Sequence, residues 1–210
     1  MRRIVDIVGA GLALILLAPV LLGIALLIAI TDGLPVLYRQ TRVGKDARPF
    51  LILKFRTMRP GLPGASITAA GDSRVTQIGG FLRKLKLDEL PQFFNVLLGD
   101  MSLIGPRPEV PDYVQVDDPL WQEVLSTRPG ITDLASLAFR DEEQLLGPVP
   151  DADRYYRAVI LPAKLRLNLL YLRSRSLLTD SRLLWLTAVY SLLPGAFSRS
   201  RVLDTLRNDA

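Results

Sequence analysis

Two adjacent carboxylates, Asp88 and Glu89, are the side chains of this sequence with the clearest capacity for chemistry. They open a stretch that predicts a helix, Asp88 to Leu98, with Asp88 as N-cap, Pro91 in the first turn and Gly99 as the stop. A helix N-terminus favours negative charge and binds phosphate, and Mg²⁺ prefers carboxylate and phosphate oxygens. The pair therefore suits a nucleophile, an incoming phosphate and Mg²⁺. Simple helix capping is the more common reason for an acidic first turn, so the pair by itself leaves both interpretations open.

The residue types that are missing narrow the chemistry. The 210-residue sequence has no histidine and no cysteine. This excludes disulfides, thiol nucleophiles, zinc sites built on these residues, and Ser-His or Cys-His catalysis. A Walker A sequence and a G-x-G-x-x-G motif are also missing, which disfavours P-loop and dinucleotide-binding folds. Any reaction must depend on acidic, basic or hydroxyl side chains, or on a hard metal ion.

Basic residues occur at positions that suit the binding of a diphosphate. Lys54 and Arg56 share one face of a predicted strand, Phe50 to Met58, by the period-two rule. Arg107 is flanked by prolines in GPRPE, which limit its backbone, and arginine can bind phosphate through two parallel hydrogen bonds. Taken singly, each basic residue also fits a solvated or membrane-facing surface. The predicted phosphate-binding residues are Lys54, Arg56, Arg74, Arg83 and Arg107.

An uncharged apolar segment, residues 7–31, precedes these residues. It is long enough to cross roughly 30 Å of hydrocarbon as a helix, and Pro19 is expected to kink or break that helix. Arg2 and Arg3 precede the segment and seven Lys or Arg residues follow between positions 39 and 59, so the positive-inside rule draws both ends to the cytoplasm. A helix that turns back at Pro19 satisfies both flanks, whereas a kinked span satisfies one. The residues alone leave both topologies open.

The other segments predict a mainly α-helical chain with a small β element, an α+β fold. Residues 31–48 indicate a connector, residues 59–74 a loop, residues 77–86 a helix and residues 128–131 (RPGI) a turn. Between Tyr155 and Leu193, leucine-rich and basic positions alternate at helical spacing. This predicts one or two amphipathic helices, which either lie at a membrane interface or pack on the core.

Charge is distributed unevenly along the chain. The net charge is +5, yet the segment from Asp100 to Asp153 has 12 acidic and 3 basic residues, so the rest is strongly basic. Basic residues beside apolar segments favour binding to an anionic membrane surface. A solvated surface on which the charges are unevenly placed by chance is the alternative. Because no nucleic-acid motif is recognisable, no nucleic-acid partner is expected.

Longer motifs resemble those of a known family. The runs are KFRTM, then GDSRVTQIGGFLRKLKLDELPQFFNVLLGDMSLIGPRPE, then RPGIT. They strongly resemble the bacterial sugar transferases, the small monotopic phosphoglycosyl transferases that begin lipid-linked glycan assembly, as in exopolysaccharide biosynthesis. The similarity covers most of residues 31–180.

The resemblance implies a reaction and its participants. Such enzymes transfer a sugar-1-phosphate from a UDP-sugar to a polyprenyl phosphate such as undecaprenyl phosphate, release UMP, and use Mg²⁺. It implies that Asp88 is the nucleophile that forms a covalent phosphosugar intermediate and a ligand of Mg²⁺. Glu89 would assist proton handling and positioning. Family positions for phosphate and active-site contacts are occupied by Lys54, Arg56, Arg83 and Arg107.

The resemblance also implies an architecture. Residues 1–33 would form a re-entrant membrane helix broken at Pro19, and residues 34–210 a catalytic domain with interfacial helices. That domain would lie on the cytoplasmic face of the bacterial inner membrane, in contact with membrane lipid; whether it is a monomer or a homodimer is left open. Two departures from the family occur. Ala18 stands where a serine commonly precedes the proline, and Asp133–Ser136 replaces the usual Gly-Leu and Gln, so no sugar is carried over.

Two other functions compete with a transferase. One is an enzyme of the same fold that hydrolyses the nucleotide sugar or uses another lipid acceptor. The other is a basic, membrane-bound scaffold without activity, which would not need the combination of Asp88, Glu89, Lys54 and Arg107.

Overall fold

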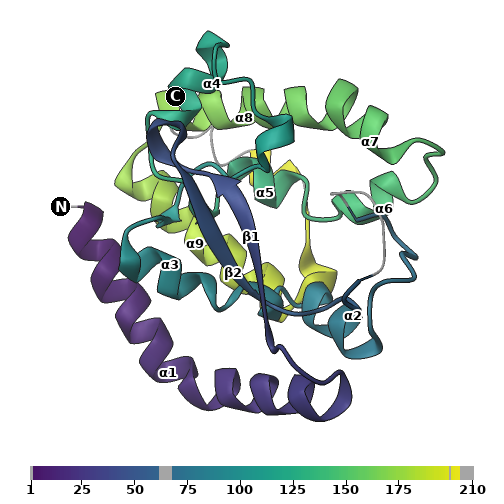
Figure 1. Cartoon of the computed structure of the whole chain (residues 1–210). Helices are drawn as coiled ribbons and strands as arrows, with labels where there is room; N and C mark the ends of the chain where they lie inside the picture. Colours follow the sequence, from purple (N-terminus) through teal and green to yellow (C-terminus); the bar gives the residue numbers. More distant parts are fainter. Residues whose placement is uncertain (1, 62–67, 199, 204–210) are drawn as a thin grey trace.

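The computed structural model describes residues 2–61, 68–198 and 200–203. These residues are mainly helical with two small sheets, as the sequence predicted (Figure 1). The helices are α1 (Arg2–Thr31), α2 (Gln77–Lys84), α3 (Gln92–Leu98), α4 (Pro119–Leu125), α5 (Leu134–Ala138), α6 (Glu142–Leu146), α7 (Ala152–Tyr155), α8 (Leu161–Arg173) and α9 (Leu177–Leu192). The strands are β1 (Leu37–Val43), β2 (Pro49–Phe55), β3 (Ser102–Ile104) and β4 (Gly130–Thr132).

Strands β1 and β2 form an antiparallel pair in which Tyr38 lies opposite Lys54. The predicted strand is confirmed as β2, although it ends at Phe55 rather than Met58. The connector predicted over residues 31–48 contains strand β1, which the sequence did not predict. Most of β1 is exposed, so its sequence lacks the apolar alternation that identifies a half-buried strand. The loop predicted over residues 59–74 lies partly outside the described residues.

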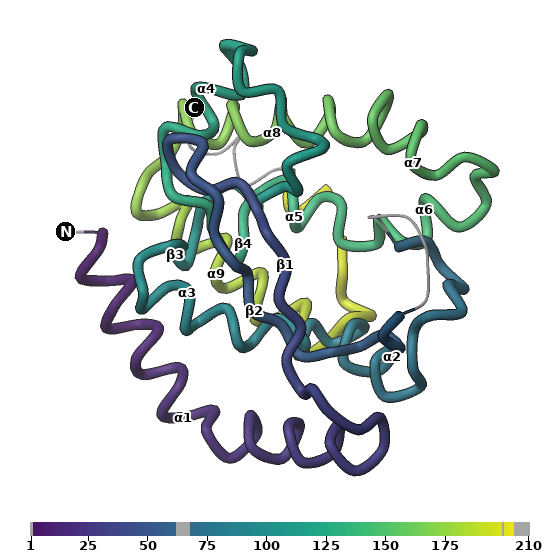
Figure 2. Tube along the Cα trace, viewed as in Figure 1, coloured from purple at the N-terminus to yellow at the C-terminus, as the bar shows by residue number. Residues whose placement is uncertain are grey.

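Strands β3 and β4 form a short parallel pair, visible near the centre of Figure 2. The turn predicted at RPGI is wrong, because Gly130 begins β4. A Cβ at Gly130 would lie 2.1 Å from the backbone nitrogen of Gly105, so this close approach of two chains requires glycine. Gly105 N–H donates to the carbonyl of Thr132 (3.0 Å), and Gly130 N–H to that of Pro106 (3.0 Å). The backbone that leads to Arg107 is therefore fixed to β4.

The helix predicted to begin at Asp88 begins four residues later. Residues Leu87–Glu89 form a 3₁₀ turn (η2), and α3 starts after Pro91, its N-cap. The prediction that Asp88 is an N-cap is therefore wrong. Lys86 has a left-handed backbone (φ +59°), which redirects the chain before a helix can start. The C-terminal end is as predicted, with Gly99 in the left-handed conformation (φ +98°); α2 also lies where expected.

The two long C-terminal helices differ in what they cover. Helix α8 buries Leu165, Leu169 and Tyr171 in the core. Of the two predicted positions, a membrane interface or packing on the core, it therefore has the second. A π-helical turn, Tyr156–Ile160, joins α7 to α8. Helix α9 buries Leu183 but leaves a row of large apolar side chains in solvent. The exposed residues of α9 are Leu177, Leu178, Leu184, Trp185 and Leu192.

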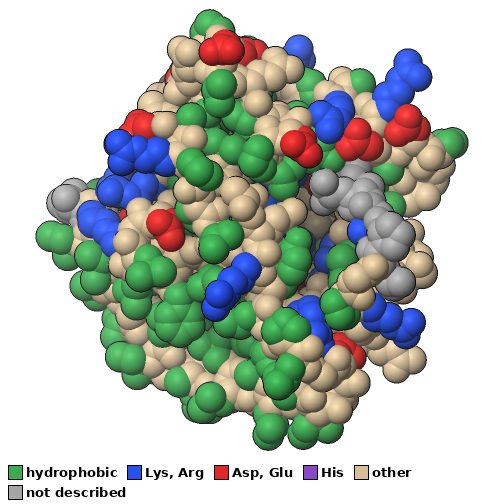
Figure 3. Space-filling view, viewed as in Figure 1, with side chains coloured by type: hydrophobic (Ala, Val, Ile, Leu, Met, Phe, Trp, Pro, Cys, Tyr) green, Lys and Arg blue, Asp and Glu red, His purple; other side chains and the backbone are tan. Residues whose placement is uncertain are grey.

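Helix α1 is continuous through Pro19 and changes direction along its length (Figure 1). Proline inside a helix removes a hydrogen bond and accounts for such a bend. Among the described residues, α1 is the one helix whose length and composition suffice to cross a membrane. Most of its large apolar side chains are exposed, and green apolar atoms accordingly gather on the lower part of Figure 3. The helix therefore needs an apolar environment that the protein itself does not supply.

The N-terminal half of α1 is attached to the rest of the protein by polar contacts. Arg3 donates to the carbonyls of Val96 (2.6 Å) and Leu97 (2.9 Å) at the end of α3. The buried carboxylate of Asp6 accepts hydrogen bonds from Ser102 Oγ (2.8 Å) and from Leu103 N–H (2.9 Å) of β3. This end of α1 is thus bound to the same body that contains the strands.

The C-terminal end of α1 is bound to that body as well. Thr76 Oγ1 donates to the carboxylate of Asp32 (2.7 Å), directly after the helix. Arg56 donates to the carbonyls of Asp32 (2.6 Å) and Gly33 (2.7 Å). Both ends of the apolar helix therefore contact one folded domain by polar groups.

We expect Asp6→Ala to destabilise the protein, because the buried Ser102 hydroxyl and Leu103 amide lose their acceptor. The loss should be about 1–3 kcal/mol, measured by thermal or denaturant unfolding in detergent micelles. Asp117→Ala is the control, since Asp117 is exposed. Equal unfolding midpoints for the two variants would show that Asp6 does not fix α1 to β3.

Candidate active site

The carboxylate of Glu89 lies between two cations. Arg107 Nη1 donates to Glu89 Oε2 (2.9 Å), and Arg107 Nη2 also contacts Oε1, which makes the pair bidentate. Lys54 Nζ lies 3.3 Å from Glu89 Oε1. These three side chains come from β2, from the 3₁₀ turn η2 and from the segment after β3. The structure thus brings together three of the predicted site residues, which are far apart in the sequence.

Asp88 lies beside this cluster but outside its hydrogen bonds. Its side chain is buried, and within the described part of the chain Oδ1 has no hydrogen-bond partner. Burial raises the pKa of Asp88, and the negative charge of Glu89 raises it further. A buried carboxylate without a donor is costly to stability, which points to a function rather than to a structural role.

The pKa of Glu89 moves in the opposite direction. Burial alone would raise it, but the positive charges of Arg107 and Lys54 outweigh burial and hold the pKa well below its usual range. Burial also lowers the pKa of Lys54 to about 8, against the opposing effect of Glu89. Burial would lower the pKa of Arg107 too, yet its contacts with Glu89 raise it overall. Glu89 is therefore ionised at neutral pH, and neighbouring carboxylates with diverging pKa values have different roles.

A cavity of about 1450 Å³ contains Asp88 and the Glu89 cluster. This volume exceeds the roughly 300–1,000 Å³ of a pocket for one small molecule. Figure 3 shows this face hollowed right of centre, with Lys and Arg side chains in its depth. One part of the lining is apolar and comes from α1 and α9: Leu17, Val20, Leu184, Ala188 and Leu192. Another part is polar: Arg42, Glu109, Glu142, Tyr156 and Lys164.

The other predicted phosphate-binding residues line the cavity but have protein partners. Arg83 donates from Nε to Glu143 Oε1 (3.1 Å). Arg74 binds the carboxylate of Asp72, with 2.6 Å from Nη2 to Oδ2. Arg56 is bonded to the end of α1, as described above, so it positions that helix. The structure groups Lys54 and Arg107 with the carboxylates, whereas these three lie at other points of the lining.

The polar part of the lining was not found by sequence reasoning. Glu109 is the last residue of the GPRPE motif, so its nearness to Arg107 was a usable signal. Tyr156, Lys164 and Glu142 lie in segments whose sequences indicated amphipathic or acidic surface. Only the packing of α6, α8 and β1 around one cavity brings them together.

The donor set limits which metal ion the site can bind. No group of three or more acidic residues with metal-binding geometry occurs in the part of the chain that the structure describes. Both oxygens of Glu89 are occupied by cations, which leaves the Asp88 carboxylate as the donor for a metal ion at this place. Mg²⁺ commonly takes one or two carboxylates and completes its octahedron with water and substrate phosphates. The residues fit an Mg²⁺ ion that arrives with a diphosphate.

Comparison with known proteins places this arrangement in a class. The chain belongs to the bacterial sugar transferase family, whose family model matches residues 1–193. Three similar proteins have names that state an activity or a process. The first is the UDP-N-acetylgalactosamine-undecaprenyl-phosphate N-acetylgalactosaminephosphotransferase of Aeromonas hydrophila, 46% identical over 141 residues, or 65% of this chain and 33% of that protein.

The second is the UDP-glucose:undecaprenyl-phosphate glucose-1-phosphate transferase of Klebsiella pneumoniae, 38% identical over 192 residues, or 89% of this chain and 39% of that protein. The third is the exopolysaccharide production protein PSS of Rhizobium leguminosarum bv. phaseoli, 37% identical over 205 residues, or 93% of this chain and 96% of that protein. The chain thus spans about a third of the first two relatives and nearly all of the third.

The opposite electrostatics of the two carboxylates predict opposite effects on stability. Asp88→Asn should raise the unfolding midpoint, because a raised pKa means that the ionised form destabilises the fold at pH 7. Glu89→Gln should lower the free energy of unfolding by about 1–3 kcal/mol, because it leaves two half-buried cations without their anion. Thermal unfolding of both variants in detergent at pH 7 tests the pair. Shifts of the same sign would contradict this description of the site.

Proposed function

We propose that this protein transfers a sugar-1-phosphate from a UDP-sugar to undecaprenyl phosphate and releases UMP. The observation that carries the proposal is Asp88, a buried carboxylate that lines the cavity with Lys54 and Arg107 and whose Oδ1 has no hydrogen-bond partner among the described residues. The names of the relatives support the substrate classes. The family relationship supports membership of the phosphoglycosyl transferases.

In the first step, an Asp88 oxygen attacks the β-phosphorus of the UDP-sugar. An O–P bond forms between Asp88 and the phosphosugar, and the bond from the β-phosphorus to the bridging oxygen breaks. UMP leaves with that electron pair, and the product is an aspartyl-phosphosugar. An oxygen without a hydrogen-bond donor keeps its lone pairs available for this attack. Covalent catalysis divides one difficult displacement into two easier ones.

Lys54 and Arg107 bind the diphosphate in this proposal, and Glu89 positions them. Both cations contact the carboxylate of Glu89, which supports the proposal that their side chains can bind one anion together. Because the pKa of Glu89 lies well below its usual range, this residue holds its cations rather than moving a proton at neutral pH. The role in proton handling that the family resemblance implied is therefore not part of the proposal.

Mg²⁺ is the proposed cofactor, with Asp88 as its protein ligand and substrate phosphate and water as the others. When bound, it would offset negative charge on the diphosphate. The charges of Lys54 and Arg107 act in the same direction, so the protein supplies part of this compensation itself.

In the second step, an oxygen of undecaprenyl phosphate attacks the phosphorus of the aspartyl-phosphosugar. The new O–P bond gives a lipid-linked diphosphate sugar, and the Asp88 carboxylate leaves unchanged. The apolar lining contributed by Leu17 and Val20 of α1 and by Leu184 and Leu192 of α9 supports this step. It lets an isoprenoid chain approach the cavity from the lipid that surrounds α1.

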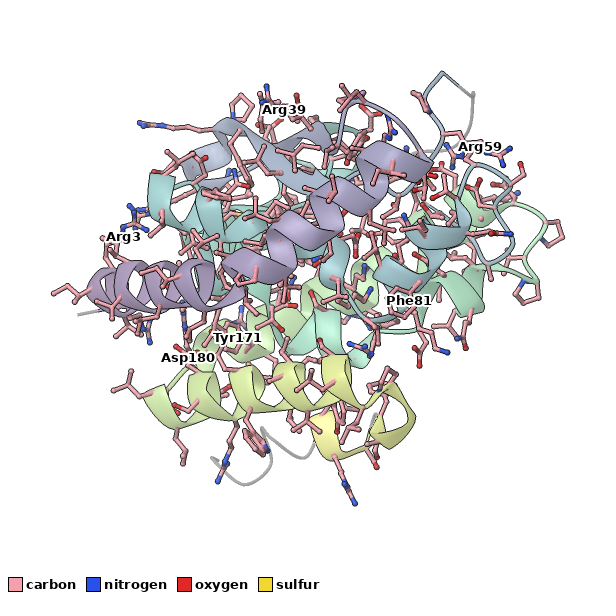
Figure 4. All side chains as sticks on the ribbon, turned by 90° about the horizontal axis from the view of Figure 1, so that it is seen from below. Arg3, Arg39, Arg59, Phe81, Tyr171 and Asp180 are labelled. Atoms are coloured by element: carbon pink, nitrogen blue, oxygen red, sulfur yellow. The ribbon has the colours of Figure 1, made fainter. Side chains whose placement is uncertain are left out.

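We further propose that α1 is re-entrant and that the catalytic domain rests on the cytoplasmic face of the bacterial inner membrane. Polar contacts of Asp6 and Asp32 bind both ends of α1 to one domain. A straight span would place these two ends on opposite sides of the membrane. In the view from below, α1 and α9 cross this side of the molecule with Phe81 between them (Figure 4). Exposed Phe81 and Trp185 suit the boundary between lipid and water.

The transferase proposal predicts UMP release that requires both substrates and Asp88. Purified protein with Mg²⁺, undecaprenyl phosphate and a panel of UDP-sugars should release UMP with at least one sugar and form a lipid-linked product. Asp88→Asn should reduce this rate at least 10³-fold, on the order of the loss of a covalent nucleophile. Asp117→Asn, at an exposed aspartate, is the control and should retain the rate.

The products separate the alternatives. Free sugar phosphate without a lipid-linked sugar would indicate hydrolysis, and full activity of Asp88→Asn would remove Asp88 from the reaction. Silence across the panel, with no phosphosugar adduct on Asp88 by mass spectrometry, would favour a non-catalytic scaffold.

The re-entrant topology predicts that both ends of α1 are accessible from the same side. Because the chain has no cysteine, Arg2→Cys and Lys45→Cys each introduce a single label site. A membrane-impermeant maleimide should label neither in intact spheroplasts and both in inverted vesicles. Labelling from opposite sides would establish a spanning helix.

A further inference from the structure

The polar part of the cavity is a connected cluster of side chains that the proposed chemistry does not use. Tyr156 Oη donates to Glu109 Oε1 (2.7 Å), and Lys164 Nζ lies 3.3 Å from Tyr156 Oη. Lys164 also pairs with Glu142, and Arg42 Nη1 lies 3.8 Å from Glu109 Oε2. We refer to these five residues as the Tyr156 cluster. All five line the cavity that contains Asp88.

The Tyr156 cluster is costly to the fold. Tyr156 is 2% exposed and Lys164 is 9% exposed, so a phenol and an ammonium group are held away from water among carboxylates. Buried ion pairs usually contribute little net stability compared with apolar side chains of the same size. Stability alone therefore does not account for five such groups around one cavity.

An irregular helical turn directs Tyr156 and Lys164 to the same place. In a regular α-helix, side chains eight residues apart differ by about 80° around the axis, whereas those seven apart nearly coincide. The π-turn Tyr156–Ile160 contains one extra residue, so positions 156 and 164 share a face. Turns of this kind inside helices are frequent at functional sites. Their alignment is thus a second observation, independent of burial, that points to a ligand.

The chemistry of the cluster selects among the parts of the substrates. The carboxylates of Glu109 and Glu142 offset the charges of Arg42 and Lys164, so the cluster offers no net positive charge to a phosphate. The apolar chain of the lipid fits the apolar part of the lining instead. Sugar hydroxyls both donate and accept hydrogen bonds, which matches acceptors at Glu109 and Glu142 and donors at Arg42 and Lys164. The ring of Tyr113, 5.0 Å from that of Tyr156, adds an apolar face beside them.

The position of the cluster relative to the reacting groups fits the same ligand. Glu109 follows Arg107 by two residues, and Arg107 is the cation that contacts Glu89. A diphosphate held at Lys54 and Arg107 therefore has the Tyr156 cluster on one side. We propose that the Tyr156 cluster binds the hexose ring of the sugar nucleotide and that Tyr156 and Lys164 determine which sugar is accepted. This inference rests on the proposed function for the identity of the donor.

Binding measurements test this assignment without turnover. In an Asp88→Asn background, which cannot consume the donor, calorimetry would compare UDP with UDP-glucose, UDP-galactose and their two N-acetylhexosamine counterparts. Adding Tyr156→Phe should weaken the tightest-binding UDP-sugar about tenfold, as expected for the loss of one hydrogen bond with a charged network, and change UDP less than twofold. Tyr155→Phe, at the exposed neighbouring tyrosine, is the control and should change neither.

Lys164→Gln provides a second variant should Tyr156→Phe fail to fold, and the same difference between UDP-sugar and UDP is expected. Equal weakening of UDP and UDP-sugars would assign the cluster to the nucleotide and overturn the proposal. Unchanged affinities in a folded variant would also overturn it, because the cluster would then be structural. UMP release by the protein with intact Asp88 is measured separately. Loss of the transferase proposal would appear as no UMP release, whereas loss of the sugar-site proposal would appear only in the binding of UDP-sugars.

Discussion

The rest of the site depends on the carboxylate of Glu89, because two half-buried cations share it. Lys54 comes from β2 and Arg107 from the segment after β3, and without an anion between them they would repel each other in a poorly solvated place. Glu89 thereby joins three parts of the chain and satisfies its own charge. Asp88, the next residue, is left without a partner on Oδ1 among the described residues. One ion cluster thus accounts for the positions of Lys54 and Arg107, and in the proposed reaction it leaves Asp88 as the nucleophile.

Strand β3 connects this cluster to the apolar helix α1. Asp6 of α1 accepts hydrogen bonds at the start of β3, and Arg175 donates to the carbonyl of Ile104 at its end (2.8 Å). The chain then passes Gly105, fixed to β4, and reaches Arg107. The apolar helix and the cations of the candidate site are therefore separated by one short, fully buried strand. In the proposed reaction, which joins a water-soluble donor to a lipid acceptor, this connection would hold the reacting groups close to the lipid.

The sequence was a good guide wherever the signal was local. The apolar run of α1, the strand β2, the helix α2 and the stop at Gly99 follow from hydropathy, period and glycine conformation. It failed where distant contacts decide. Strand β1 has no apolar alternation because it is an exposed edge, and β4 looks like a turn because glycine is there for close contact with β3 rather than for chain reversal. The start of α3 was misplaced because Lys86 adopts a left-handed conformation that its residue type does not require.

For the site, the sequence by itself determined the chemical inventory: an Asp-Glu pair, several arginines and lysines, no histidine and no cysteine. It also determined the apolar helix and, through long motifs, the family. Only the tertiary structure decided which cations belong to the carboxylates, separating Lys54 and Arg107 from Arg56, and only it assembled the cluster around Tyr156. The physical reason is that burial and charge neighbours set the role of an ionisable group. Both are properties of packing between segments far apart in the chain, which no local pattern records.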